Sequence, residues 1–242
     1  MITVITSVNQ RYYDLIGKDC IESWLRHWPS CMNLTVYTEH MSLAPHPRLR
    51  TIDFDQLDPD YARFQDDPNL NQSEKKFAKK AYCFMHAMQA VTAGWIMWID
   101  ADVISIDDQP LDLWQNLLVP RAATMYMGVN YVLDKQGQPG SWLVPETGVF
   151  AVNRDHVDFE QFRAEYCRRY HERDRTGLRR YYDNDVFGAA LAHLRATDHA
   201  DLCTGFAKPY KTPLPHTILG HYLIHYKAKH SKAEYIQPVE DQ

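Results

Sequence analysis

The chain has 242 residues, of which 45% are hydrophobic and 24% charged, with a formal net charge of −5. This length suffices for one large domain or two small ones with a sizeable core. The slightly acidic balance argues against a broad electrostatic surface for nucleic acid. The cysteines are odd in number, scattered, and form no Cys-x-x-Cys pair. That usage favours free thiols in a reducing compartment over a disulfide framework.

The stretch MITVITSVNQRYYDL lacks the basic region, the apolar run and the small-residue cleavage site of a signal peptide. Every apolar run falls well short of the roughly 18 residues that a membrane span requires. We therefore expect a cytoplasmic protein without a membrane span.

Hydrophobic periodicity predicts alternating strands and helices in the first part of the chain. Strands are expected at 2–8, 33–39, 48–54 and 95–99, and helices at 18–28 and 73–91, the latter capped by Ser73. The intervening stretch 55–72 is rich in Asp, Pro, Asn and Gln. It is typical of a long loop, which could act as a lid over a site.

The second part of the chain is less regular. A short helix is expected at 108–118, strands at 122–128 and 148–153 around a hairpin excursion at 129–145, helices at 156–172 and 181–194, and an irregular tail from 203. Strands that alternate with helices favour an α/β fold with a largely parallel sheet.

Two acids, Asp100 and Asp102, follow the apolar strand 95–99 with one residue between them. Ligands of open α/β sheets bind beyond the carboxyl ends of the strands, and residues i and i+2 of an extended chain point to the same side. The two carboxylates can therefore converge on one hard cation such as Mg²⁺ or Mn²⁺, which also takes phosphate oxygens as ligands. An Asp-x-Asp triplet also arises by chance and can simply end a strand.

The sequence WIDADV around these acids resembles the DxD signature of GT-A-fold glycosyltransferases, enzymes that use nucleotide-diphosphate sugars. Other segments lie in the order of that fold and cover most of the chain. The first strand is represented by VITSVN, the Lys-bearing helix by KKFAKKAYCF, the segment lining the sugar and acceptor site by PETGVFAVNRDH, and the late His-plus-Lys segment by HYLIHYKAKH. The stretch YYDNDVFGAAL is similar to the Asp-Gln-Asp helix start of the retaining glycogenin-like and lipopolysaccharide galactosyltransferase families, with Asn in place of Gln. The late segment lacks the Gly-rich HxxGxxKPW form of some relatives.

This resemblance implies a GT-A-like, Rossmann-like α/β fold with a mostly parallel sheet flanked by helices, fused into a single domain over 1–242. Residues 1–105 would bind the nucleotide sugar, and residues 106–242 would form the acceptor side with a closing C-terminal segment. The implied activity is metal-dependent transfer of a sugar, a hexose, from a nucleotide-diphosphate sugar to the hydroxyl of a glycan or other acceptor. A UDP-sugar is the favoured donor, and nucleic acid is not indicated as a partner.

The resemblance also implies roles for individual residues. The Mn²⁺ or Mg²⁺ ligands would be Asp100, Asp102 and His225. Donor contacts would come from Thr6, Ser7, Lys80, Asp100, Lys227, Lys229 and His230. Catalytic groups would be Asp183, Asn184, Asp185 and Glu146.

Each of these residues also has an ordinary structural interpretation. His225 could be a core or surface histidine, and its spacing from His221 without an adjacent Glu makes a zinc motif weak. Lys79 is the alternative to Lys80 on the same helix, and helical periodicity favours Lys80 because it places that residue closer to Phe77 and Phe84. Helix starts favour Asp and Asn as caps, Glu146 could stabilise a turn, and the late lysines could form a solvated basic tail.

The triplet at 183–185 bears on stereochemistry. An inverting transferase needs a carboxylate as general base beside the acceptor hydroxyl, whereas an amide flanked by acids suits retention, which we therefore favour. A nucleotidyltransferase or metal-dependent phosphohydrolase on a similar sheet remains an alternative, although SVNQRYYD lacks the glycines of a phosphate loop. A non-catalytic carbohydrate-binding relative is the third interpretation.

Overall fold

A seven-stranded sheet forms the centre of the computed structural model, which describes residues 1–130, 143–194, 199–203 and 213–226. The strand order is β3-β2-β1-β4-β7-β6-β8. The strands are β1 (Ile2–Asn9), β2 (Met32–Glu39), β3 (Leu49–Asp53), β4 (Trp95–Ile99), β6 (Thr124–Asn130), β7 (Leu143–Asn153) and β8 (His199–Asp201). Only β7 runs against its neighbours, β4 and β6, while the other pairs are parallel. The predicted α/β fold with a mostly parallel sheet is confirmed.

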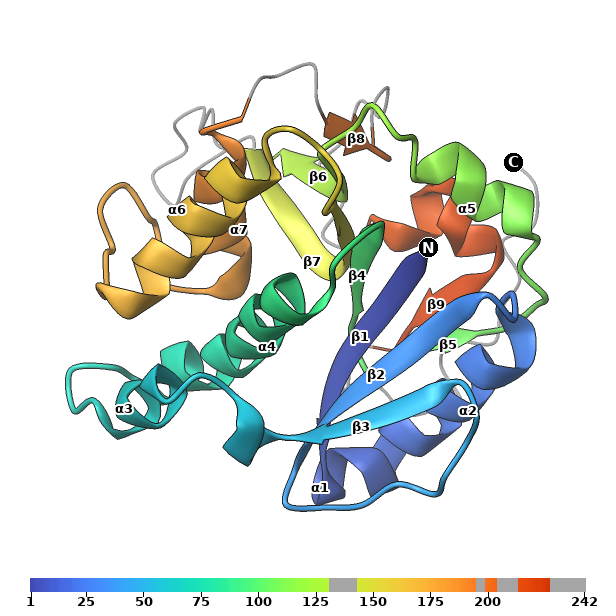
Figure 1. The fold of residues 1–242 in the computed structure, drawn as a ribbon, viewed down its shortest axis with the longest axis horizontal. Helices are drawn as coiled ribbons and strands as arrows, with labels where there is room; N and C mark the ends of the chain where they lie inside the picture. Colours follow the sequence, from blue (N-terminus) through green and yellow to red (C-terminus); the bar gives the residue numbers. More distant parts are fainter. Residues whose placement is uncertain (131–142, 195–198, 204–212, 227–242) are drawn as a thin grey trace.

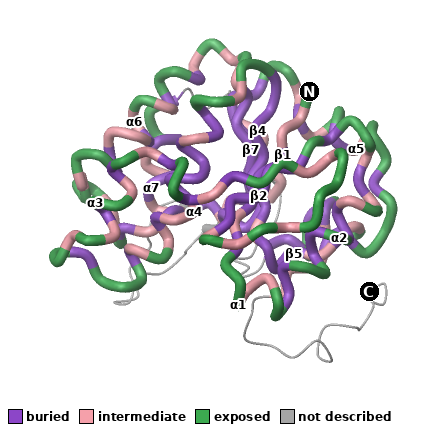
Figure 2. The backbone as a smooth tube through the Cα atoms, turned by 60° about the horizontal axis from the view of Figure 1, so that its bottom comes forward, coloured by how far each residue is buried: buried purple, intermediate pink, exposed green. Residues whose placement is uncertain are grey.

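Helices cover both faces of this sheet (Figure 1). On one side lie α3 (Asp60–Asp66), α4 (Gln72–Ala90), α6 (Phe159–His171) and α7 (Asp183–Leu191), and on the other α2 (Lys18–His27) and α5 (Leu111–Leu117). Each face has its own apolar cluster, with Phe84, Phe150 and Phe187 on the α4 side and Trp24 and Trp114 on the α2 side. The strands between the two layers are buried along most of their length (Figure 2).

Strand β1 shows why the middle of the sheet is apolar on both faces. It pairs in parallel with β2 and with β4. Its side chains alternate between the two clusters, with Ile5 in the α4-side cluster and Val4 and Val8 in the α2-side cluster. A strand buried on both faces needs a nearly continuous apolar run rather than alternation, which is what residues 2–8 provide.

Short elements complete the described chain. They are α1 (Gln10–Tyr12), a π-helical turn (Tyr13–Gly17), η2 (Phe54–Gln56), β5 (Val103–Ser105), η4 (Leu214–His216), η5 (Ile218–His221) and β9 (Leu223–His225). The first two make the helical region after β1 begin earlier than the predicted residue 18. The tail is more ordered than expected, because β9 pairs with β5 in a second, two-stranded sheet.

Helix α4 begins at Gln72 with Asn71 as its cap, so the prediction of Ser73 as the cap was wrong. The Asn71 side chain accepts from the backbone N–H groups of Ser73 and Glu74, and the Glu74 carboxylate accepts from the Asn71 N–H, a reciprocal capping box. The helix is followed by Gly94 at φ 83°, where a Cβ would lie 2.3 Å from the Met1 carbonyl oxygen. Only glycine fits this close approach.

The predicted loop at 55–72 contains helix α3, so that prediction was wrong. Phe64 of α3 is fully buried in the α4-side cluster. Asp60 accepts a 2.5 Å hydrogen bond from the Tyr82 hydroxyl and a 2.7 Å bond from the Arg173 guanidinium. Composition alone suggested a loop because it does not reveal these long-range partners. The segment is pinned to α4 and to the end of α6, which argues against a freely moving lid.

The excursion predicted at 129–145 is a hairpin in its described part, since β6 and β7 pair antiparallel, while residues 131–142 lie outside the described residues. Among the helices that the structure describes, none combines the length and the apolar character needed to cross a bilayer.

Candidate active site

The two acids and the late histidine meet at the carboxyl end of β4. Asp100 follows the strand directly, and its N–H donates to the Gly148 carbonyl oxygen of β7 at 2.8 Å. After Asp102 the chain enters β5, which pairs antiparallel with β9 so that Val103 lies opposite His225. The Tyr226 N–H donates to the Asp102 carbonyl oxygen at 2.8 Å. Backbone pairing therefore places His225 beside the acid pair.

Asp100, Asp102 and His225 offer ligand atoms that all lie within 4.8 Å of one another. The His225 Nε2 is 3.1 Å from an Asp102 carboxylate oxygen, and both side chains are nearly buried. Burial alone would lower the pKa of His225, but the hydrogen bond and charge of Asp102 outweigh it and raise that pKa. Two carboxylates and an imidazole form a donor set that suits Mn²⁺ or Mg²⁺. The residues therefore fit the metal that the resemblance implied.

Lys80 is the buried cation of the site. Its Nζ lies 2.8 Å from Asp100, 2.9 Å from Asp183 and 2.6 Å from the Thr147 carbonyl oxygen. Burial would lower the pKa of Lys80, but the two carboxylates raise it, so the side chain is charged. Lys79, the alternative weighed from the sequence, points away and binds Glu39 of β2 at 2.6 Å.

Glu146 and Gly148 flank the opposite side of the histidine. The Glu146 Oε1 lies 3.8 Å from His225 Nδ1, and the other carboxylate oxygen, Oε2, accepts from the Gly148 N–H at 2.8 Å. Burial raises the pKa of Glu146, with His225 opposing. A Cβ on Gly148 would lie 2.9 Å from the His225 ring and 3.0 Å from both Glu146 oxygens. The glycine is thus required by the close packing of these two side chains.

The triplet Asp183, Asn184 and Asp185 opens α7, but none of the three is the cap, because the cap position is Tyr182 and its side chain makes no capping bond. Asp183 points into the site, where it binds Lys80 and accepts from the Thr147 hydroxyl at 2.6 Å. Asp185 lies 3.7 Å from each of two arginines on the other side, and burial raises its pKa. Asn184 is partly exposed between them.

The remaining predicted donor residues are less well placed. Thr6 is completely buried in the α2-side layer and presents no surface to a ligand, so it does not suit the donor contact expected of it. Its neighbour Ser7 is partly exposed near the end of β1. Lys227, Lys229 and His230 lie outside the described residues. His221 is exposed and is not part of the cluster.

Tyr12, Trp98 and Thr147 belong to the site and were missed from the sequence. The Trp98 indole N–H donates to Asp100 at 2.7 Å, which helps to orient that carboxylate. Burial raises the pKa of Tyr12, and the charge of Asp102 and a hydrogen bond to Asp102 raise it further. Tyr12 follows β1 at the same sheet edge as the acids, and that position was the signal that could have identified it.

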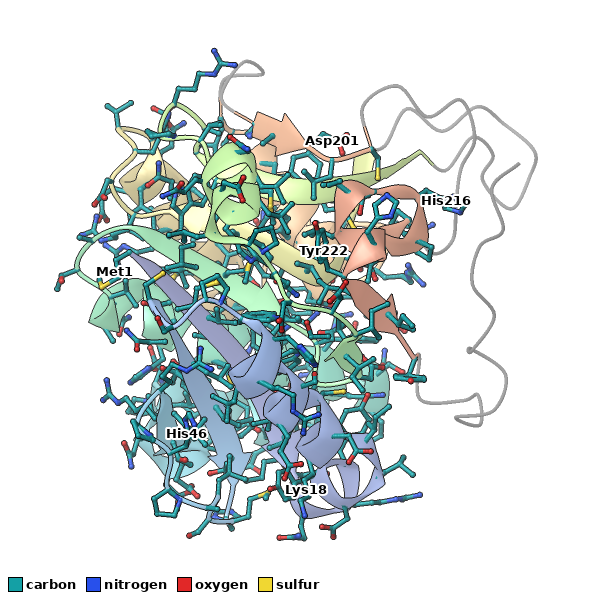
Figure 3. All side chains as sticks on the ribbon, turned by 90° about the vertical axis from the view of Figure 1, so that its right-hand side faces the viewer. Met1, Lys18, His46, Asp201, His216 and Tyr222 are labelled. Atoms are coloured by element: carbon teal, nitrogen blue, oxygen red, sulfur yellow. The ribbon has the colours of Figure 1, made fainter. Side chains whose placement is uncertain are left out.

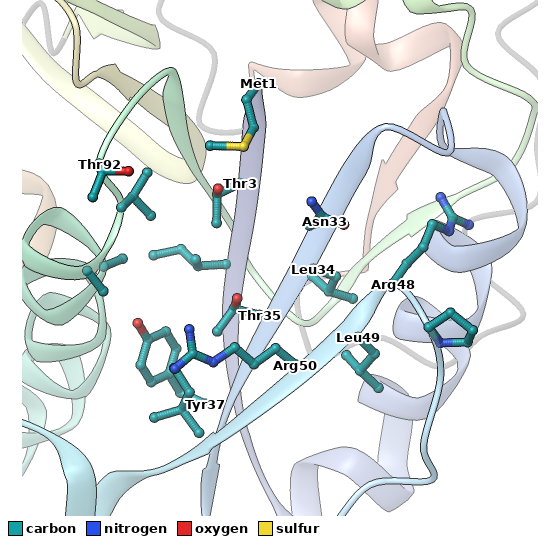
Figure 4. Close-up of a pocket in the computed structure, with 16 residues that line it drawn as sticks. Met1, Thr3, Asn33, Leu34, Thr35, Tyr37, Arg48, Leu49, Arg50 and Thr92 are labelled. Carbon is teal, nitrogen blue, oxygen red and sulfur yellow. The ribbon is translucent and has the colours of Figure 1, made fainter.

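A separate cavity of about 350 Å³ lies at the other end of the strands. It is lined by Met1 and Thr3 at the start of β1, by Tyr37 and Arg50, and by Thr92 after α4 (Figure 4). Because β1 and β4 start here and carry the acid cluster at their far ends, this cavity is not part of the candidate active site.

No family model and no curated protein matches this sequence. Solved structures match in fold. A bifunctional glycosyltransferase, WbbM, superposes with a TM-score of 0.53 at 14% identity over 83% of this chain and 38% of its own. The galactosyltransferase LgtC, in complex with donor and acceptor sugar analogs, gives a TM-score of 0.50 at 16% identity, covering 89% of this chain and 82% of that one. Mouse xyloside xylosyltransferase 1 gives a TM-score of 0.51 at 13% identity, covering 84% of this chain and 86% of that one.

These similarities show that the chain has the GT-A glycosyltransferase fold. It spans much less than half the length of WbbM but most of the other two proteins.

Proposed function

We propose that this protein is a metal-dependent glycosyltransferase that moves a sugar from a nucleotide-diphosphate sugar to an acceptor hydroxyl. The observation that carries the proposal is the joining of the Asp100–Asp102–His225 cluster to the buried Lys80–Asp183 pair through Asp100 itself. A cation site for a diphosphate therefore lies next to a polar site of opposite charges that suits sugar hydroxyls. The fold is that of enzymes which carry out this reaction.

Each group has a chemical task in this proposal. Asp100, Asp102 and His225 would hold Mn²⁺ or Mg²⁺, which when bound would offset the charge on the departing diphosphate. Asp100 and Asp183 would accept hydrogen bonds from hydroxyls of the donor sugar. Lys80, whose three N–H donors already serve Asp100, Asp183 and the Thr147 carbonyl oxygen, would hold the two carboxylates in position. Glu146 would contact an acceptor hydroxyl beside His225. In the reaction, the bond from the anomeric carbon to phosphate oxygen breaks, a bond to the acceptor oxygen forms, and the acceptor proton passes to the diphosphate.

Retention is the proposed stereochemical course. Asp183 is neutralised by Lys80 and bonded to Thr147, and Asp185 lies beside two arginines, so neither is a free general base. Asn184 would lie beneath the anomeric carbon as a polar, uncharged group.

The donor is a UDP-sugar in this proposal, since that was the donor favoured by the resemblance. The division into a donor half, 1–105, and an acceptor half, 106–242, remains a prediction.

The test is a panel of UDP-, GDP- and dTDP-sugars, with binding and slow hydrolysis measured with Mn²⁺ and with excess chelator. A glycosyltransferase releases free sugar and nucleoside diphosphate. Release of sugar phosphate and nucleoside monophosphate would instead identify a phosphohydrolase, and binding without turnover on any acceptor would favour a carbohydrate-binding protein. Proton NMR of fresh product decides the stereochemistry, because a β-linked product from an α-linked donor rules out retention.

A further inference from the structure

Two cations and two aromatic rings form a continuous stack beside the candidate site. The Phe77 and Tyr182 rings have their centroids 4.6 Å apart. The Arg180 guanidinium lies 4.7 Å from the centroid of Tyr182, and the Lys76 Nζ lies 5.8 Å from that of Phe77. These four residues are termed the cationic ladder. It joins α4 to the residues just before α7.

The ladder lies directly outward from the sugar-binding groups proposed above. Phe77 precedes Lys80 by about one helical turn, and Tyr182 precedes Asp183, to which Lys80 is bound at 2.9 Å. Helix α4 ends where β4 begins, while Lys80 reaches Asp100 at the carboxyl end of β4. The ladder, nearer the start of α4, therefore lies beyond the carboxyl edge of the sheet, where ligands of such sheets bind.

The described residues around the ladder offset its positive charge only in part. Arg180 and Arg179 share one carboxylate, Asp185, each at 3.7 Å, which is beyond hydrogen-bond distance. In the described part of the chain, Lys76 has no ion pair, and Arg180 is half exposed. A guanidinium stacked on an aromatic ring keeps its in-plane N–H donors free for bidentate binding of a carboxylate or phosphate. Stacking also restrains the side chain, so that less entropy is lost when an anion binds.

We propose that the cationic ladder binds an oxyanion, a carboxylate or a phosphate, carried by the acceptor glycan. This inference rests on the proposed glycosyltransferase function and names the class of its acceptor. The donor diphosphate is assigned to the other end of the site, because in the described part of the chain the proposed metal ligands are linked to the ladder through Asp100, Lys80 and Asp183. An anion at the ladder would hold the acceptor across the sugar-binding groups, with its reactive hydroxyl toward Glu146.

The experiment compares three probes: methyl β-glucuronide, glucose 6-phosphate and the neutral methyl β-glucoside. Ligand-observed NMR measures their dissociation constants at low and at high salt. We expect at least one anionic probe to bind about tenfold more tightly than the neutral one at low salt, as a charge-assisted bidentate contact allows, and high salt to reduce this preference. Whichever anion binds better identifies the acceptor group as carboxylate or phosphate.

The decisive variant is Lys76→Gln with Arg180→Gln, which should abolish the preference for the anion. Tyr182→Leu, which keeps both charges but removes the stacking surface, should reduce it. The matched control is Lys18→Gln, since Lys18 (Figure 3) is also an exposed cation but starts α2, on the face of the sheet opposite α4 and α7. Circular dichroism confirms that the variants are folded. Equal binding of charged and neutral probes, or a preference that survives the double substitution, would overturn the proposal.

Two further arms separate this inference from the proposed function. If the double substitution weakens the binding of UDP-glucuronate but not that of UDP-glucose, the ladder contacts the donor sugar. In that case the assignment of the ladder to the acceptor is wrong. Hydrolysis of the donor panel by the unmodified protein is measured in parallel. Intact donor hydrolysis with no anion preference refutes the ladder alone, whereas absent donor binding refutes the glycosyltransferase proposal and leaves the probe result to stand by itself.

Discussion

Replacing Lys80 by Met should test how strongly the buried cation holds the site together. The change keeps the length of the side chain and removes its charge. It would leave Asp100 and Asp183 facing each other without the cation that now lies 2.8 and 2.9 Å from them. It would also remove the donor to the Thr147 carbonyl oxygen. Asp183 and Thr147 are buried, so water cannot readily replace the interactions that these two residues lose.

The size of the effect follows from burial. Removing one partner of a buried ion pair costs about 3–5 kcal/mol, because a charge is left uncompensated. The Asp183 side chain is only 5% exposed but that of Asp100 is 28% exposed, so solvent relieves part of the penalty. We therefore expect a loss of about 3 kcal/mol in the free energy of unfolding. Urea denaturation followed by circular dichroism measures it.

The neighbouring lysine provides the control. Lys79 binds both oxygens of Glu39, but the two side chains are 30% and 26% exposed. An ion pair this accessible contributes at most about 1 kcal/mol, so Lys79→Met should cost about a third as much as Lys80→Met. Equal losses of unfolding free energy in the two variants would refute the argument that burial makes the Lys80 ion pairs the more stabilising ones. A stable Lys80→Met protein that still hydrolysed donor at the normal rate would also remove Lys80 from the sugar site.

Three further predictions address other parts of the molecule. Asp102→Ala should abolish Mn²⁺ binding in calorimetry and transfer in a coupled assay while the protein stays folded, and full activity in excess chelator would contradict the metal role. Gly148→Ala should weaken Mn²⁺ binding about tenfold or more, because its Cβ would displace the His225 ring; unchanged affinity would show that the ring has room to move. Hydrogen bonds from Arg173 and other donors outweigh burial and lower the pKa of Asp60 to about 2, so its stabilisation is present above about pH 4 and is lost as the pH falls toward 2. Asp60→Asn should therefore lower the urea midpoint at pH 7, and the difference from the unmodified protein should shrink at pH 2.5; a constant difference would contradict this account.

Much of the sheet was predictable because its strands are locally encoded. Residues 2–8 and 95–99 are apolar runs that can only be buried, and their order along the chain, with helices between them, predicts parallel pairing. The acid pair was recognisable for the same reason, since a strand that ends in Asp-x-Asp places both groups at a known edge. Lys80 was preferred over Lys79 from periodicity, and the structure brings Lys80 to the acids.

Other features depend on contacts that no local pattern reveals. Helix α3 is held by Phe64 in the core and by Asp60 against Arg173, a partner far along the chain. Asp183 and Asp185 look equivalent in sequence, yet the start of α7 directs them to opposite surroundings. Thr6 appeared suitable because it lies near the end of β1, but strand alternation turns its side chain into the α2-side layer rather than toward the edge.

The β5–β9 pairing has a consequence for how the protein is made. Asp102 leaves the ribosome on the order of ten seconds before His225, at ordinary rates of synthesis. The strands β1 to β4 could pair in that interval, but the third ligand would arrive only when β9 adds to β5 with Val103 opposite His225. A nascent chain would thus acquire these strands before the proposed metal site is complete. Incomplete chains would remain unable to capture a cation, or to consume donor, until the strand carrying His225 had been synthesised and paired.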